Sequence, residues 1–194
     1  MYLLAQYKFR LCKIGLIVLL VFCAGKSFSQ LSDTENIPVL TFDFFKGVPK
    51  ADSPYASVIF INHKYFYTVR EQKDDGTVLL DVKINALPDS AMSFFDRSRV
   101  KDTEVEELVN HERGHLIIGY LIGNLLRKTL NAAIYTSNYR EEIKALFTKY
   151  HQEYGQLQTQ YDDETNHGTN RGVQKLWNVK VRQLYLTSLD GQER

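Results

Sequence analysis

His111-Glu112-Arg113-Gly114-His115 matches the pattern H-E-x-x-H and lies inside a run, Asp102 to Leu130, that reads as one amphipathic helix. Two histidines four residues apart on a helix lie on one face, about one turn apart, so their imidazoles can bind the same metal ion. The glutamate after the first histidine then lies beside the metal without ligating it. A zinc hydrolase needs such a pair of nitrogen ligands and a carboxylate that accepts a proton from the bound water. The stretch therefore predicts one Zn²⁺ ion held by His111 and His115, with Glu112 as the catalytic base; the alternative is an exposed helix face that happens to carry two histidines.

The helix predicted at residues 102–130 has recognisable ends. Asp102 is a credible N-cap, and glutamates follow it in the first turns, where the helix dipole favours negative charge. Gly114 and Gly119 are poor helix formers, each costing about 1 kcal/mol relative to alanine. Their presence indicates close packing of another element, or room for a metal and a substrate.

Residues 1–29 have the features of a secretory signal peptide. A positive segment, an apolar core and small residues at a cleavage site follow one another: Lys8, Arg10 and Lys13, then Ile14 to Gly25, then Ser27-Phe28-Ser29. The dozen apolar residues are too few to span a bilayer comfortably. We expect export to the periplasm or secretion as residues 30–194, with no membrane span in the mature form. An uncleaved anchor and a lipoprotein formed at Cys23 are the alternatives.

The expected mature chain is mildly acidic and free of cysteine. Both cysteines, Cys12 and Cys23, precede residue 30, so the remaining 165 residues form no disulfide. A chain of that length buries one adequate core without cross-links, and a single domain over residues 30–194 is expected. Residues 1–29 carry four cations and no acid, so their loss changes the formal net charge from +1 to −3. Without a basic stripe, nucleic acid is not an expected partner.

The rest of the chain predicts an α+β fold, a small antiparallel sheet followed by three helices. Three runs, 55–62, 64–71 and 77–86, are rich in β-branched and aromatic residues, and Asp75-Gly76 between the last two is a strong hairpin signal. About three strands are expected, with His63 at a surface bend between the first two, and an edge strand or a link at 87–100. Helical spacing predicts two further helices, at about 137–157 and 171–186, with Trp177 in the core.

A catalytic zinc ion usually keeps three protein ligands and one open position. The sequence offers three places for the third ligand: His167, the pair Asp162 and Asp163, and Glu153 on the second helix. The first two places lie in the polar run Tyr161 to Gly168, which is expected to connect two helices. Because of their positions beside His167, Tyr161 is predicted to stabilise the oxyanion and Asp162 to orient a ligand imidazole.

The sequence resembles a family of exported bacterial proteins of unknown function that are described as predicted zinc-dependent proteases. The likeness rests on H-E-x-x-H followed by Y-D-x-x-T-x-H-G, both intact here, and it extends to Thr41–Gly47, to the helix through Lys128, and to Gln174 and Trp177. The resemblance implies a zincin-like site at His111, His115 and His167, with Glu112 catalytic. One departure is Leu116-Ile117, where relatives often carry an aromatic residue and an acid; it affects the surroundings of the metal rather than its ligands.

These features favour a zinc-dependent metallopeptidase that hydrolyses a peptide or protein substrate in the cell envelope or outside the cell. Hydrolysis of another bond needs the same metal site. The alternative is a non-enzymatic exported module with a zincin-like fold that binds zinc or a peptide. Glu112 favours the enzyme, because a purely structural zinc site needs no unligated carboxylate beside it. The sequence does not indicate an oligomeric state.

Overall fold

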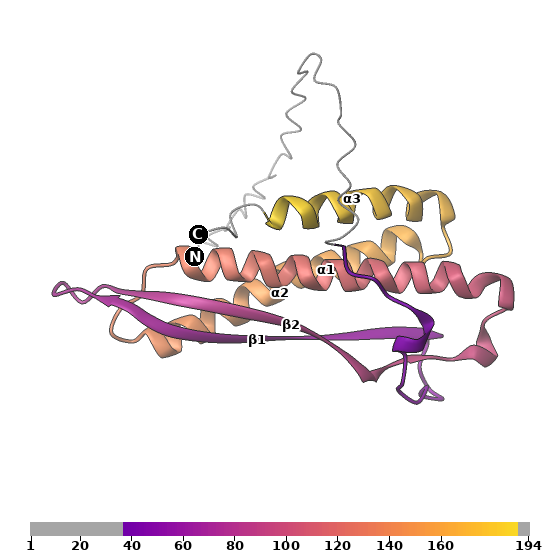
Figure 1. The fold of residues 1–194 in the computed structure, drawn as a ribbon, viewed down its shortest axis with the longest axis horizontal. Helices are drawn as coiled ribbons and strands as arrows, with labels where there is room; N and C mark the ends of the chain where they lie inside the picture. The colour runs from indigo at the N-terminus through magenta and orange to yellow at the C-terminus, as the bar shows by residue number, and fades with distance from the viewer. Residues whose placement is uncertain (1–36, 190–194) are drawn as a thin grey trace, which may run out of the picture. The chain divides into compact units, whose positions relative to one another are not determined.

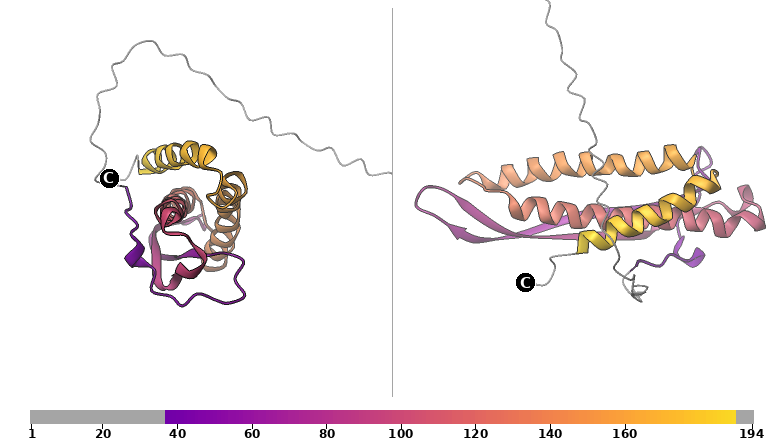
Figure 2. Two further views of the ribbon diagram at one scale, coloured as in Figure 1. Left: turned by 90° about the vertical axis from the view of Figure 1, so that its right-hand side faces the viewer. Right: turned by 90° about the horizontal axis from the view of Figure 1, so that it is seen from above.

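Helix α1 (Val105–Ala132) carries the H-E-x-x-H stretch, and the sheet and the other helices pack around it (Figure 1). The computed structural model describes residues 37–189; the expected signal peptide at residues 1–29 lies outside the described residues. Viewed end-on, α1 is central, with the strands on one side and helices α2 (Tyr139–Thr165) and α3 (Arg171–Leu189) on others (Figure 2). None of the helices between residues 37 and 189 combines the length and apolar character needed to cross a membrane.

Within residues 37–189 the sheet consists of two long antiparallel strands, not the three or so that were predicted. Strand β1 (Ser57–Gln72) joins the runs predicted at 55–62 and 64–71, and strand β2 (Val78–Phe95) joins 77–86 to most of 87–100. The predicted bend at His63 is wrong, because His63 pairs with Ala86 in the middle of the ladder. The His63 side chain lies on the inward face of β1. It breaks the apolar pattern of the sequence, but the strand continues through it. The Asp-Gly turn is confirmed, and Gly76 has a φ of +84°.

The helices agree with the predicted order but differ at their ends. Helix α1 is preceded by a separate 3₁₀ helix (Asp102–Glu104), so Asp102 is not its N-cap; the Asp102 carboxylate pairs with Arg97 instead. Helix α2 continues well past the predicted end at residue 157, so most of the polar run from Tyr161 is helical rather than a connector. Its polar residues suggested a loop, but Tyr161 and Thr165, one turn apart, are both fully buried. Helix α3 matches its predicted range closely.

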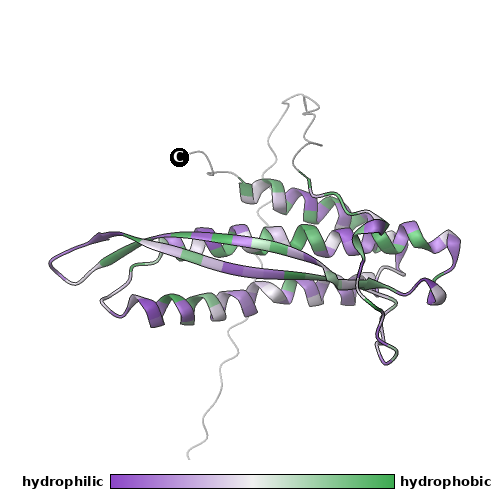
Figure 3. Ribbon diagram, turned by 60° about the horizontal axis from the view of Figure 1, so that its bottom comes forward, coloured by the Kyte–Doolittle hydropathy of each residue, from purple (hydrophilic) through white to green (hydrophobic). Residues whose placement is uncertain are grey.

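Two hydrophobic clusters fix α1 against its neighbours, and apolar residues lie along its length (Figure 3). The first joins α1 to α2 and α3: Ile117, Ile118, Leu121, Ile122, Leu126, Tyr161, Trp177, Val181 and Tyr185. The second joins the end of α1 to β2 and the start of α2: Val78, Leu80, Val82, Leu130, Tyr135 and Ile143. Burying each large side chain contributes about 1.5–3 kcal/mol. Trp177 is 2% exposed, as predicted for the core. This packing places the first half of α1 beside the last turns of α2.

Candidate metal centre

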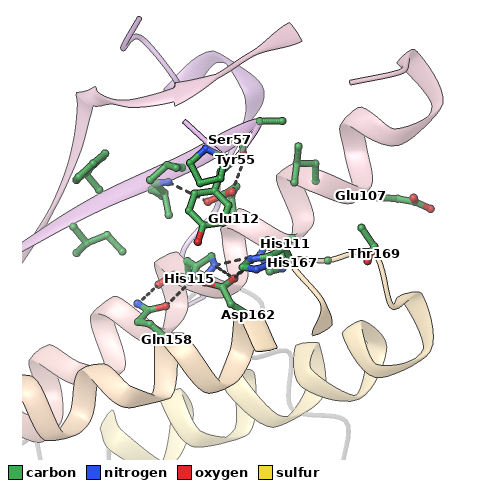
Figure 4. Close-up of a pocket in the computed structure, with 18 of the residues that line it drawn as sticks. Tyr55, Ser57, Glu107, His111, Glu112, His115, Gln158, Asp162, His167 and Thr169 are labelled. Carbon is green, nitrogen blue, oxygen red and sulfur yellow. Dashed lines mark hydrogen bonds and ion pairs between the residues drawn. The ribbon is translucent and has the colours of Figure 1, made fainter. Parts of the chain in front are cut away.

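Three side-chain atoms from helices α1 and α2 converge in the cleft that these helices form with β1 (Figure 4). His115 Nε2 lies 2.9 Å and His111 Nε2 lies 3.1 Å from Asp162 Oδ1, and the two Nε2 atoms are 3.2 Å apart. All three atoms lie within 4.8 Å of one another. Imidazole nitrogens and carboxylate oxygens are common ligands of Zn²⁺. The donor set therefore fits a zinc ion.

The second ring nitrogen of each histidine is held by a glutamine. His111 Nδ1 lies 3.1 Å from Gln174 Oε1, and His115 Nδ1 lies 2.5 Å from Gln158 Oε1. The amide nitrogens are occupied elsewhere: Gln174 Nε2 donates to the Tyr161 hydroxyl and Gln158 Nε2 to the His115 carbonyl oxygen. Each Oε1 thus accepts a hydrogen bond from Nδ1–H. Both Nε2 atoms then present lone pairs to the centre, which is the tautomer that a metal ligand requires.

The centre attracts positive charge. Three atoms with lone pairs at these distances repel one another unless a cation lies among them. Burial lowers the pKa of His115, but the hydrogen bond to Asp162 and the charges of Glu112 and Asp162 outweigh it and raise that pKa above its ordinary value. Burial raises the pKa of Asp162, yet hydrogen bonds with His111 and His115 hold it well below its usual range. In the metal-free protein a proton is therefore favoured where a metal ion fits.

Glu112 lies on the strand side of the three ligand atoms (Figure 4) and outside that group. Its Oε1 accepts a hydrogen bond from the Ser57 hydroxyl, and its Oε2 accepts one from the Ile59 N–H at 3.0 Å. The side chain is 3% exposed. Strand β1 thus fixes both carboxylate oxygens beside the candidate metal position.

Tyr161 lies beneath the H-E-x-x-H turn and is fully buried. Its ring stacks on His111 with centroids 4.8 Å apart, and its hydroxyl donates to the His111 carbonyl oxygen at 2.9 Å. Burial raises the pKa of this hydroxyl far above its ordinary value of 10. The oxyanion role predicted for Tyr161 does not agree with this position. Its contacts instead hold the backbone and the ring of a metal ligand in place.

Helix α1 approaches Tyr161 most closely at Gly114, where an added Cβ would overlap the tyrosine ring and hydroxyl. We expect Gly114→Ala to lower the free energy of unfolding by about 1–3 kcal/mol, because a fully buried ring has no room to move. Gly155→Ala is the matched control: no heavy atom lies within 4 Å of its added Cβ, and helix propensity should stabilise it by about 0.5–1 kcal/mol. Urea denaturation of the metal-free proteins measures both. Equal effects of the two substitutions would contradict the close approach.

Of the other candidates for the third ligand, one lies beside Asp162 and two lie away from the histidine pair. His167 Nδ1 is 3.4 Å from Asp162 Oδ1, and the His167 ring, 46% exposed, packs against Tyr55. Asn166 and His167 have positive φ values, which end α2 and turn His167 back toward the centre. Asp163 is exposed, and Glu153 lines a separate hollow on α2. The structure therefore does not bring Glu153 to the histidine pair.

The cleft has a volume of about 1050 Å³ and extends to a second histidine pair. His63 Nδ1 lies 3.2 Å from His151 Nε2, and His63 Nε2 lies 2.7 Å from the Gly119 carbonyl oxygen. Because a carbonyl oxygen only accepts hydrogen bonds, His63 Nε2 carries a proton, and a neutral His63 then accepts a hydrogen bond at Nδ1 from His151 Nε2. His151 and Asp162 are three turns apart on α2, about 16 Å at the helical rise.

Burial lowers the pKa of His63 below 6.5; the Gly119 carbonyl opposes this shift, and the charge of His151 adds to it. The unfolded chain then takes up a proton more readily than the folded chain. Stability therefore falls as the pH decreases from about 6.5 toward the folded pKa. We expect acidification from about pH 7.5 to about pH 5.5 to destabilise the metal-free wild type more than His63→Gln, which keeps an amide donor near Gly119. Urea titrations at several pH values test this, and equal pH slopes would contradict it.

The sequence patterns indicated no role for Gln158, His151 or Ser57. The first two share a face of α2 with Asp162, at spacings of four and eleven residues, and a prediction that extended this helix to residue 165 would have found them. Ser57 offers no such local signal, because its contact with Glu112 joins residues 55 positions apart.

Comparisons with curated proteins and with solved structures gave no match for the chain. A family model matches a central segment, residues 76–168, which contains β2, α1 and α2. His111, His115, Asp162 and His167 all lie within this segment, whereas Ser57 and Gln174 lie outside it. Over residues 76–168, the chain thus matches a family described as a bacterial protein of unknown function (DUF922).

Proposed function

We propose that this protein is a zinc-dependent hydrolase that cleaves peptide bonds at a zincin-like centre. One observation carries the proposal: two histidine Nε2 atoms and one carboxylate oxygen converge, and a second carboxylate lies beside them without joining the group. This is the combination of metal ligands and unligated base that metal-assisted hydrolysis requires.

His111, His115 and Asp162 are the proposed ligands. The resemblance of the sequence implies His167 in place of Asp162, but Asp162 Oδ1 is the atom within 3.1 Å of both Nε2 atoms. His167 then contacts Asp162 from the exposed side and closes that edge of the cleft together with Tyr55. Gln158 and Gln174 keep both imidazoles in the tautomer that binds a metal.

When bound, a zinc ion lowers the pKa of a coordinated water to about 7 and polarises a carbonyl oxygen. Glu112 accepts the proton of the attacking water and delivers it to the leaving amine. The Ser57 hydroxyl and the Ile59 N–H orient the Glu112 carboxylate for this task. Tyr161 holds α1 in position by donating a hydrogen bond from its hydroxyl to the His111 carbonyl oxygen.

The shape of the cleft supports a peptide as the substrate. It follows β1 from Ser57 to His63 and α2 from Asp162 to His151, so it is long, and it remains open to solvent at the rim. At about 1050 Å³ it lies just above the usual range for sites that enclose one small molecule. An extended chain fits such a groove better than a compact ligand does.

A non-enzymatic zinc- or peptide-binding module is the second candidate. It is favoured by the environment of Glu112, because both carboxylate oxygens already have hydrogen-bond partners on β1 and the side chain is buried. In that case Glu112 serves only to join α1 to the sheet.

Metal content and chelator-sensitive cleavage test the proposal together. The full-length protein is expressed with its own N-terminus and purified, its zinc is quantified by mass spectrometry, and it is incubated with a mixed peptide library. We expect one zinc per chain and cleavage that a chelator abolishes and added Zn²⁺ restores. Zinc without chelator-sensitive cleavage would establish the binding module instead. A protein that takes up no zinc even when it is supplied would overturn the hydrolase and leave a module that binds peptide without zinc.

A further inference from the structure

Between its two histidine pairs, the cleft has an open position on the wall formed by α2, where the residue is a glycine. Helix α2 faces the cleft with His151, Gly155, Gln158 and Asp162, which recur at every third or fourth residue. A Cβ added at Gly155 would meet no heavy atom within 4 Å. A glycine inside a helix costs about 1 kcal/mol relative to alanine, and here no close approach of another element requires it. Its effect is to widen the cleft at this point.

The other walls of this section are apolar. Ile61 of β1 packs against Gly119 of α1, and Ile122 follows one turn further along the same helix. In the described part of the chain, none of the charged residues that line the cleft comes from the stretches of β1, α1 and α2 that form this section, 61–63, 119–122 and 151–158. These charged lining residues are Arg99, Glu104, Glu107, Glu112, Asp162 and Arg171. A charged group in this section would therefore lose water without gaining a partner, at a cost of several kcal/mol.

The end of the section is polar. His63 is fixed by the Gly119 carbonyl oxygen, and His151 is held by its hydrogen bond to His63 and by the ring of Phe147, whose centroid lies 5.5 Å away. Both nitrogens of His63 and Nε2 of His151 are engaged in these contacts, so Nδ1 of His151 is the ring nitrogen that could still exchange a hydrogen bond with a hydroxyl. The section thus combines apolar sides with a hydrogen-bonding end.

We propose that this section, defined by Ile61, His63, Ile122, His151 and Gly155, is a subsite for one large uncharged side chain of an extended peptide. It selects aromatic and long aliphatic residues close to the cleaved bond, and it tolerates a hydroxyl at the tip of the ring. Gly155 is the residue that determines this specificity. The inference rests on the proposed peptidase function for its substrate, but the subsite itself needs no metal.

Gly155→Leu tests the subsite, because leucine is a good helix former that fills the open wall. Gly155→Ala adds little volume, and Gln156→Leu places the same side chain on the exposed outer face of α2, so both serve as controls. In the first experiment, p-cresol is titrated into metal-free protein and the methyl signals of Ile61 and Ile122 are followed by NMR. We expect shifts in the wild type and in both controls, and at least about 10-fold weaker binding in Gly155→Leu.

In the second experiment, zinc-loaded protein cleaves two sets of peptides that differ only in carrying alanine or tyrosine at the residue next to the cleaved bond. We expect Gly155→Leu to lower kcat/KM for the tyrosine peptides by about 10-fold or more relative to the alanine peptides, and Gln156→Leu to leave both sets unchanged. Circular dichroism confirms that each variant is folded.

The two experiments separate the subsite from the catalytic proposal. Binding of p-cresol that depends on residue 155, in a protein that cleaves no peptide, supports the subsite and overturns the peptidase function. Cleavage with no p-cresol binding and with the same peptide preference in Gly155→Leu overturns the subsite and keeps the function. A wild-type preference for charged side chains at this position would also overturn it.

Discussion

Asp162→Asn is expected to weaken Zn²⁺ binding by about 100-fold or more, and His167→Ala is expected to weaken it by about 10-fold at most. The asparagine keeps the volume of Asp162 but removes the charge that the two Nε2 atoms face at 2.9 and 3.1 Å. His167 touches the same carboxylate only from the solvent side, at 3.4 Å. Its loss removes a neighbour of a ligand rather than a ligand. Competition with a chromophoric chelator at fixed pH measures both affinities.

Asp163→Asn is the matched control for this comparison, because it makes the same chemical change one residue further along α2, at an exposed position. Its zinc affinity should equal that of the wild type. If His167→Ala lost zinc and Asp162→Asn kept it, the ligand set would be the three histidines that the resemblance implies, and Asp162 would orient them.

The two candidates for the third ligand show how far the sequence could predict this site. His111, Glu112 and His115 are local to one helix, so their spacing was enough to place them together. Asp162 could be related to them only through the packing of α2 on α1. That packing depends on Tyr161, which looked like part of a polar connector although its side chain is fully buried. The helix boundary was therefore the decisive error, since it hid the face shared by His151, Gln158 and Asp162.

The sheet was mispredicted for a related reason. In β1 the inward positions continue through His63, whose polarity is compensated by the Gly119 carbonyl oxygen and by His151. A half-buried polar residue with distant partners cannot be distinguished from a turn residue by periodicity alone. Both errors involve residues that line the cleft. Polar side chains there replace the apolar residues that a core would carry, so the periodicity no longer indicates the secondary structure.

Glu112→Gln is expected to reduce peptide turnover by about 10²–10⁴-fold while zinc content stays at one per chain. The amide keeps the shape of the side chain, and its oxygen can still accept a hydrogen bond from the Ile59 N–H, but it cannot take a proton from water. Steady-state kinetics on a cleaved library peptide, with zinc quantified in the same samples, measures the effect.

Glu107→Gln provides the control, because it makes the same change five residues earlier on α1, at a rim position where the carboxylate pairs with Arg171. Its turnover should stay within a few-fold of the wild type. Ser57→Ala then separates the two roles that Glu112 could play. If Glu112 is the base, loss of the Ser57 hydroxyl disorders it and lowers kcat with little change in zinc affinity. If Glu112 only joins α1 to β1, Glu112→Gln and Ser57→Ala both reduce stability by about 1 kcal/mol and neither alters turnover. That second result would leave the metal centre intact and assign the proton transfer to another group in the cleft.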